Sequence, residues 1–383
     1  MRRAELPALT GIRFYAALLV FVSHIVAIPG MDVLGGHRLW FNAGVVGVAF
    51  FFVLSGFILT YNYADLFRNG VAASVYRRFV WDRWTKLYPV HFAALLLVLP
   101  IQLYSPNLPL DWRAVPFHLF LAQCWWPITQ PTFYNYLNVP SWSISCEWFF
   151  YLVAPFIICF SVSKSRRWTL AALLAAYAGA LGLWLSHADS DFTRLYLVSW
   201  FAPSRLPEFI TGVFLARVFL RVREGRLKGL AVYAQAVGIV SIAAGAVYRP
   251  HAPWPFWGGL LYIPGSALLV LGLAYGRGFF AAHLGRPWLR RLGMASFSFY
   301  LLHAPLIRAF KGACLYLGWQ VRSWPMFWFV TVIVFVLIQS VAIAVYYFYE
   351  APVQKKLRAL VRRPPNVPMA PQARILSTAV PQI

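Results

Sequence analysis

The stretch VVGVAFFFVLSGFILTYNY, residues 45–63, contains no charged side chain. About 20 mostly apolar residues in a helix are enough to cross the hydrocarbon core of a bilayer. A helix of a water-soluble domain would carry polar residues on one face, and this stretch has no such face. The stretch therefore predicts a transmembrane helix.

Similar stretches recur on both sides of it. The whole chain is 61% hydrophobic and 12% charged, which is about half the charged fraction of soluble domains. We therefore expect an all-α polytopic membrane protein with about ten transmembrane helices. The predicted spans are residues 9–28, 45–63, 88–104, 144–161, 168–186, 204–220, 230–248, 257–275, 296–317 and 326–349.

Positive charges set the predicted topology. Lys and Arg gather at 68–86, 164–167, 217–228, 277–291 and 355–363. All of these segments face the cytoplasm, as the positive-inside rule requires, only if the shorter apolar stretch 114–127 does not cross. We interpret 114–127 as a re-entrant or surface segment and expect both termini in the cytoplasm. This distribution also explains the net charge of +23 without a nucleic-acid partner.

The predicted organisation is one membrane domain over residues 1–353 and a cytoplasmic tail over 354–383. The tail is basic at first and then rich in proline, and we expect it to be disordered. The gap near 105–143 is the longest between spans and is too short for a soluble domain. The first apolar run contains Arg13 and His24 and lacks a small-residue cleavage site, so we expect a retained span and not a signal peptide.

Arg13 and His24 are the first candidates for function, because ionisable side chains inside a span are costly. They are eleven residues apart, so they lie on one face of a helix, about 16 Å apart along its axis. An arginine near the cytoplasmic end suits an anionic ligand, and a deep imidazole suits proton transfer. The alternative is structural, with Arg13 snorkelling and His24 hydrogen-bonded in the core.

Acidic residues are scarce, with only 11 in the chain, so Glu147 in the outer part of a span is a second candidate. A buried carboxylate is neutral or paired, and His24 is a candidate partner. Glu147 then has either a structural hydrogen-bonding role or a catalytic one. Arg205 and Glu208 are three residues apart and are expected to pair with each other. His303 precedes Pro305 at an expected kink, where a structural role is favoured.

The segment from Arg77 to Pro89 opens the third span with Arg83, Lys86 and Tyr88. It is either an ordinary interfacial anchor or a clamp for phosphates that arrive from the cytoplasm. The glycines at Gly47 and Gly56 permit close helix packing. No P-loop, GxGxxG, HExxH or GxSxG motif is present, and the four cysteines form no CxxC pair, so no metal is expected.

These segments together resemble the bacterial acyltransferase-3 family of integral membrane O-acyltransferases. The Arg13–His24 spacing matches that family's first span, and FFVLSGF at 51–57 resembles its second-span signature. RWTKLYP at 83–89 is similar to its RxxR segment, with Lys86 in place of the second arginine. WSISCE at 142–147, SFYLLHAP at 298–305 and YEAP at 349–352 resemble its later motifs, and all matches occur in family order.

The resemblance implies transfer of an acyl group, usually acetyl, from cytoplasmic acyl-CoA to a hydroxyl. It implies a multi-pass protein of the bacterial cytoplasmic membrane, surrounded by lipid. The acceptors it implies are carbohydrates or glycosylated molecules, such as O-antigen, exopolysaccharide, lipo-oligosaccharide or a macrolide sugar. Some members carry an extracytoplasmic SGNH-type domain, for which we find no room here.

On this reading His24 and Glu147 are the catalytic candidates. Arg13, Arg83, Lys86 and Tyr88 are the candidates for holding acyl-CoA. The further candidate cavity residues are Ser143, Ser145, Tyr151, Arg205, Glu208, Tyr300 and His303. The alternative function is a transporter or channel that uses the intramembrane charges as a path, against which the absence of internal repeats counts.

Overall fold

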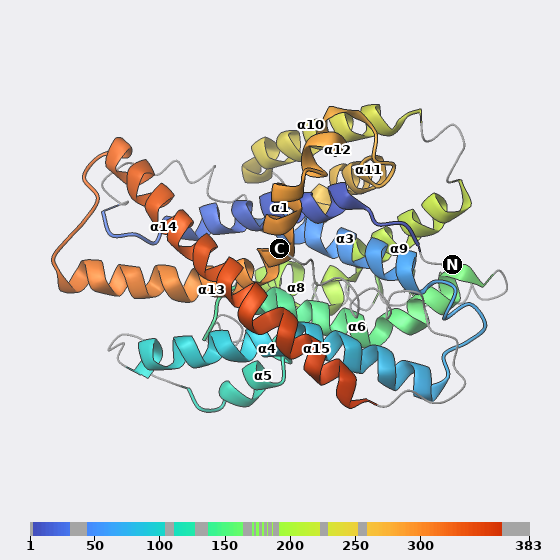
Figure 1. Cartoon of the computed structure of the whole chain (residues 1–383), viewed down its shortest axis with the longest axis horizontal. Helices are drawn as coiled ribbons and strands as arrows, with labels where there is room; N and C mark the ends of the chain where they lie inside the picture. The colour runs from blue at the N-terminus through green and yellow to red at the C-terminus, as the bar shows by residue number, and fades with distance from the viewer. Residues whose placement is uncertain are drawn as a thin grey trace.

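The structure is a computed structural model, and it describes residues 3–30, 44–103, 111–126, 137–163, 191–222, 229–251 and 259–361, with isolated positions between 171 and 186. Every regular element within these residues is helical (Figure 1). The all-α prediction is therefore confirmed for the described part of the chain. The predicted span at 168–186 lies mostly outside it.

Six helices are long and apolar enough to cross a membrane. Five of them are α1 (Pro7–Ile25), α3 (Gly44–Tyr63), α4 (Ala73–Leu103), α6 (Ser141–Val162) and α10 (Ala231–Tyr248). The sixth runs from Trp324 to Leu360 and comprises α14 (Trp324–Val345), the π-helical turn η7 (Tyr346–Glu350) and α15 (Ala351–Leu360). The chain is therefore a multi-pass membrane protein.

A seventh candidate is a bent pair, in which α11 (Ile263–Ala274) meets α12 (Gly278–Leu284) at 77°. Two further helices coincide with predicted spans, namely α9 (Leu206–Arg221) and α13 (Pro287–Tyr316). Helix α9 has 16 residues, which is short for a span, and α13 contains several charged residues, which lower its mean hydropathy. Apolarity alone therefore does not identify every helix that packs in the interior.

The basic segments are more helical than the sequence suggested. Helix α4 starts at Ala73, so most of the segment 68–86 is helix and not loop. Its 31 residues measure about 46 Å, longer than the hydrocarbon core. Lys and Arg are good helix formers whose side chains snorkel to the interface, so they extend a span. Likewise, residues 354–360 of the predicted tail are helical, within α15.

Within the stretch 114–127, the described residues 114–126 contain only α5 (Val115–Leu119), which rises about 7.5 Å and is too short to cross. Residues after α5 are held against α6. The Ser145 hydroxyl donates to the Leu121 carbonyl at 2.8 Å and accepts from the Cys124 amide at 3.2 Å. This agrees with the expectation of a non-spanning segment.

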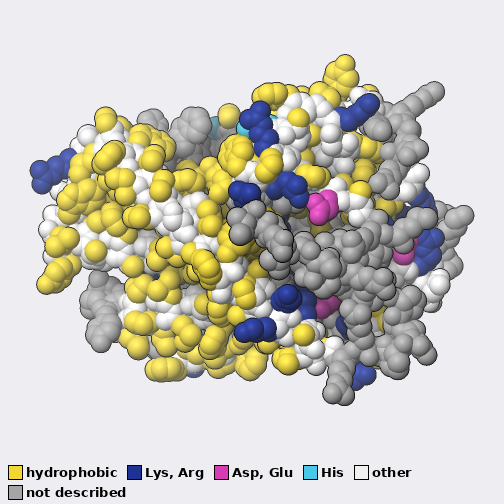
Figure 2. Space-filling model, viewed as in Figure 1, with side chains coloured by type: hydrophobic (Ala, Val, Ile, Leu, Met, Phe, Trp, Pro, Cys, Tyr) yellow, Lys and Arg dark blue, Asp and Glu magenta, His cyan; other side chains and the backbone are white. Residues whose placement is uncertain are grey.

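Helices α1 and α3 lie in the middle of the bundle, with α1 packed on α3 and α13, and α3 packed on α9 (Figure 1). A Cβ built on Gly56 would overlap the Phe209 carbonyl of α9, and one on Gly47 would overlap the Ala16 carbonyl of α1. The predicted role of these glycines in close packing is confirmed. Hydrophobic side chains cover much of the outer surface, including α10 and α14, as expected next to lipid (Figure 2).

Candidate active site

The imidazoles of His24 and His303 lie side by side between α1 and α13. Nδ1 of His24 is 3.0 Å from Nε2 of His303, and the ring centroids are 5.0 Å apart. Nδ1 of His24 is also 3.0 Å from the Val20 carbonyl, one turn back on α1. The His303 ring is fully buried and stacks on Phe299. The structure thus gives His24 a second histidine as its side-chain partner.

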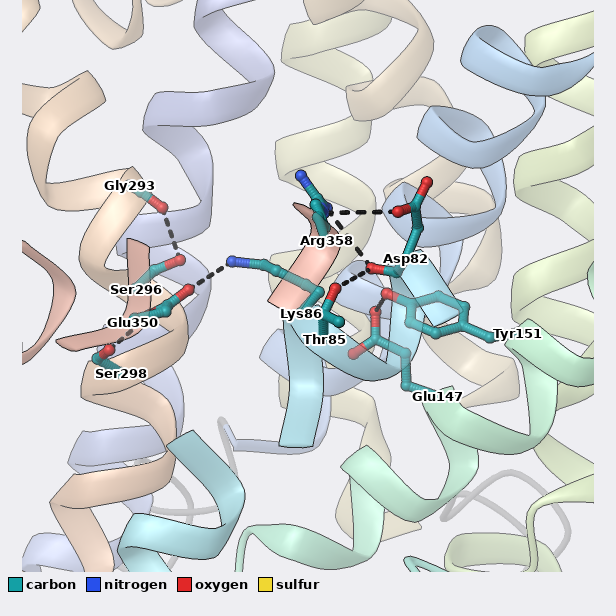
Figure 3. A network of polar contacts seen from close by, with 10 residues as sticks. All are labelled: Asp82, Thr85, Lys86, Glu147, Tyr151, Gly293, Ser296, Ser298, Glu350 and Arg358. Carbon is teal, nitrogen blue, oxygen red and sulfur yellow. Dashed lines mark hydrogen bonds and ion pairs between the residues drawn. The ribbon is translucent and has the colours of Figure 1, made fainter. Parts of the chain in front are cut away.

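Lys86 of α4 points toward the α13–η7 contact, where it forms an ion pair with the carboxylate of Glu350 (Figure 3). Its ammonium is 2.6 Å from Oε1 of Glu350, while the Ser298 hydroxyl donates to Oε2 at 2.6 Å. Glu350 is buried at the end of the π-helical turn. Lys86 is therefore already paired and is not an open phosphate ligand.

Arg13 lies close enough to Lys86 for their positive charges to repel. Among the described residues, no side chain forms a hydrogen bond or ion pair with the Arg13 guanidinium. The side chain is half-buried. Arg13 is thus a cation near Lys86, and the N–H groups of its planar guanidinium are available to bind an anion.

Glu147 is held by two hydroxyls. Ser55 of α3 donates to its Oε1 at 3.2 Å. The Tyr151 hydroxyl, one turn along α6, donates to the same oxygen (Figure 3). The Arg83 guanidinium lies over the Tyr151 ring, 5.9 Å from its centroid, and near the Glu147 charge. Arg83 also donates to the Tyr63 hydroxyl at 3.2 Å. Arg83, Tyr151 and Glu147 therefore form one polar cluster.

The expected contact between Glu147 and His24 is not present. Helices α1 and α3 are antiparallel, because Gly44 of α3 lies against Ser23 and Gly47 lies against Ala16. Ser55, which bonds Glu147, is eleven residues beyond Gly44, or about 16 Å along the helix. Glu147 therefore lies near the level of the N-terminal half of α1, the half with Arg13, and far from the level of His24.

Ser143, Tyr300, Arg205 and Glu208 form a third group. The hydroxyls of Ser143 and Tyr300 are 2.6 Å apart, and Tyr300 comes one turn before His303 on α13. Arg205 pairs with Glu208, Nε to Oε1 at 2.7 Å, as expected, and both side chains are buried. The Arg205 guanidinium stacks over the rings of Phe52 and Trp142. Tyr300 links this group to the histidines, since its ring centroid is 5.9 Å from that of His303.

Two candidates lie away from these groups. Tyr88 follows Lys86 by two residues, which turns it to the other side of α4, and its ring stacks between Trp84 and Phe92. Ser145 bonds the segment after α5 and serves the fold. The geometry therefore does not support a cavity role for Ser145. It also does not support contact between Tyr88 and the cations Lys86 and Arg13.

Sequence reasoning did not single out Glu350, Ser298 or Ser55 as site residues. Glu350 carried a usable signal, since it is one of 11 acids and follows a long apolar run. The two serines carried a weaker signal, because each lies in a segment that resembles a family motif, Ser55 in FFVLSGF at 51–57 and Ser298 in SFYLLHAP at 298–305. Among the described residues, no three His, Cys, Asp or Glu side chains cluster as metal ligands would.

Comparisons with known proteins agree with this architecture. The family model for the acyltransferase domain matches residues 6–346. The acyltransferase MdmB of Streptomyces mycarofaciens is 32% identical over 80% of this chain and 80% of its own length. The O-acetyltransferase OatA of Staphylococcus aureus is 26% identical over 92% of this chain, which spans 57% of OatA. No solved structure matches the chain significantly.

Proposed function

The chain belongs to the acyltransferase family, and from that premise we propose that it moves an acyl group from cytoplasmic acyl-CoA to a hydroxyl of a carbohydrate or glycosylated acceptor. Acetyl is the acyl group we expect, because the relative OatA is named an O-acetyltransferase. The family and these relatives make the chain an acyltransferase. The donor and the acceptor class are our proposal.

The observation that carries the proposal is the arrangement of Arg13 and His24 along α1. The Arg13 guanidinium is available to bind an anion, and the His24 imidazole lies about 16 Å further along the same helix. Coenzyme A has phosphates at one end and a thioester at the end of a long, thin arm. Phosphates at Arg13 would therefore place the thioester toward His24.

At His24 the proposed reaction is general-base catalysis. The imidazole takes the proton of the acceptor hydroxyl while its oxygen attacks the thioester carbonyl. The new O–C bond forms, the C–S bond breaks, and the thiolate takes the proton from the imidazolium. We propose that Glu147, Arg83 and Tyr151 line the path by which acyl-CoA reaches His24. This rests on the distance of Glu147 from His24 and on its contacts with Tyr151 and Arg83.

In this proposal ten helices cross the cytoplasmic membrane and both termini lie in the cytoplasm. The positive-inside pattern supports it, since Arg13 and Lys86 then stand at the cytoplasmic end, where acyl-CoA is made. The acceptor would reach His24 from the other end. The hydrophobic side chains on the outside of the bundle would face lipid (Figure 2).

The test is release of free coenzyme A from acetyl-CoA by the protein purified in detergent, with sugar acceptors present. We expect turnover by the wild type, none by His24→Ala, and a raised KM for acetyl-CoA in Arg13→Ala. A transporter would release no coenzyme A. Wild-type protein that binds acetyl-CoA but never cleaves it, or cleavage that survives in His24→Ala, would refute the proposal.

A further inference from the structure

The side-chain partner of His303 is His24. Its Nε2 is 3.0 Å from Nδ1 of His24, and the backbone carbonyls of Phe299 and Tyr300, on the preceding turn of α13, also interact with its ring. The buried contacts of His303 are otherwise aromatic, from Phe299 and Phe21.

The Val20 carbonyl decides which nitrogen of His24 carries the proton. A carbonyl oxygen only accepts, so its 3.0 Å contact requires a proton on Nδ1 of His24. A neutral imidazole has one N–H, so Nε2 of His24 is then a free lone pair. Nε2 of His303 faces the same Nδ1–H and must accept it as well.

We propose that His303 is a positioning residue that holds His24, through the Nδ1–H···Nε2 hydrogen bond, in the tautomer whose Nε2 is the base. This rests on the proposed function of His24. The role is the one that a carboxylate performs for the histidine of a catalytic triad, here performed by a neutral imidazole.

The His24–His303 hydrogen bond also stabilises the positive charge that forms on His24 during the reaction. When Nε2 of His24 takes the hydroxyl proton, the ring becomes a cation and Nδ1–H becomes a stronger donor. It then faces two acceptors, the Val20 carbonyl and Nε2 of His303. The surroundings are the apolar cluster of Phe21, Phe299 and their neighbours, where hydrogen bonds to a charge are strong. When the thiolate leaves, the Nε2 proton goes to it and both rings are neutral again.

The aromatic packing fixes the geometry that this role requires. The His303 ring lies nearly parallel to Phe299, at 20°, and edge-on to Phe21, at 69°. Its plane is therefore set by packing, and its Nε2 stays directed at His24. The catalytic contact is made by His24, and His303 acts through it.

The experiment compares His303→Leu, which removes the acceptor, with His303→Gln, whose amide oxygen can replace Nε2. We expect kcat to fall by about 100-fold in His303→Leu and by less than about tenfold in His303→Gln, with KM for acetyl-CoA nearly unchanged in both. His91→Leu is the control, since His91 is also a buried histidine, and its Nε2 is bonded to the His118 carbonyl at 2.8 Å. We expect it to keep kcat within a few-fold.

A second readout does not depend on turnover. Nitrogen-15 spectra of histidine-labelled protein should show His24 protonated at Nδ1 and a coupling between its Nδ1 and Nε2 of His303. Protonation of His24 at Nε2, or equal kcat in His303→Leu, His303→Gln and wild type, would overturn the inference. Wild type without turnover would instead reject the proposed function, while the spectra would still test the pair.

Discussion

The Lys86 ammonium lies 2.6 Å from Oε1 of the buried Glu350, so that residues 264 positions apart join α4 to the last helix of the chain. The bond fixes where the C-terminal segment docks. Because Lys86 is paired, it is not a free cation at the end of the bundle where we expect acyl-CoA to bind. Arg13 forms no such pair among the described residues, and in our proposal it is the cation that binds the incoming anion.

We therefore predict different kinetic effects for the two cations. Arg13→Ala should raise KM for acyl-CoA by about tenfold or more, since a hydrogen bond to a charged group contributes roughly 1.5–3 kcal/mol. Lys86→Met should change KM by less and should lower stability. Steady-state kinetics on both variants tests this, and a larger KM effect for Lys86→Met would contradict it.

Glu350 and Lys86 should be energetically coupled. Each single change, Lys86→Met or Glu350→Gln, leaves a partner with fewer contacts in a buried site and should destabilise the protein. The loss of unfolding free energy in the double variant should be smaller than the sum of the two single losses, by roughly 1–3 kcal/mol. Unfolding of the four proteins in mixed micelles measures the coupling, and additive losses would show that the ion pair is not formed.

The buried pair Arg205–Glu208 should matter far more than an exposed one. Glu208→Ala leaves a buried guanidinium without its carboxylate, which costs about 3–5 kcal/mol. The matched control is Glu5→Ala, which breaks the exposed pair with Arg290 at 2.8 Å and should cost less than about 1 kcal/mol. The free energy of unfolding of both variants is the measurement. Similar losses would mean that the Arg205 site is hydrated.

Gly56 should not tolerate a methyl group. A Cβ there meets the Phe209 carbonyl, so Gly56→Ala must push α3 away from α9 and should cost about 1–3 kcal/mol. Gly312→Ala in α13 is the control, because a Cβ there meets nothing, and alanine should be neutral or stabilising. Unfolding midpoints compare the two. A tolerated Gly56→Ala would show that the α3–α9 contact is looser than described.

The sequence alone determined that the chain is helical and membrane-embedded. An uncharged run such as 45–63 is long enough to cross a bilayer, and a helix forms the backbone hydrogen bonds that the bilayer core cannot supply. It also determined that Arg205 and Glu208 pair, since side chains three apart on a helix are neighbours. Helix ends were less certain. Lys and Arg extend α4 to Ala73, where the charge pattern suggested a loop.

Contacts between distant segments were decided only by the tertiary structure. Helical periodicity placed Arg13 and His24 on one face, but nothing in the local sequence measures the register of α1 against α3, α6 and α13. That register places Glu147 beside Ser55, and places His303 beside His24. A one-turn shift changes the level of a side chain by about 5.4 Å, more than the length of a hydrogen bond. The partner of each polar residue is therefore set by how the helices pack, through close glycine contacts such as Gly47 on Ala16.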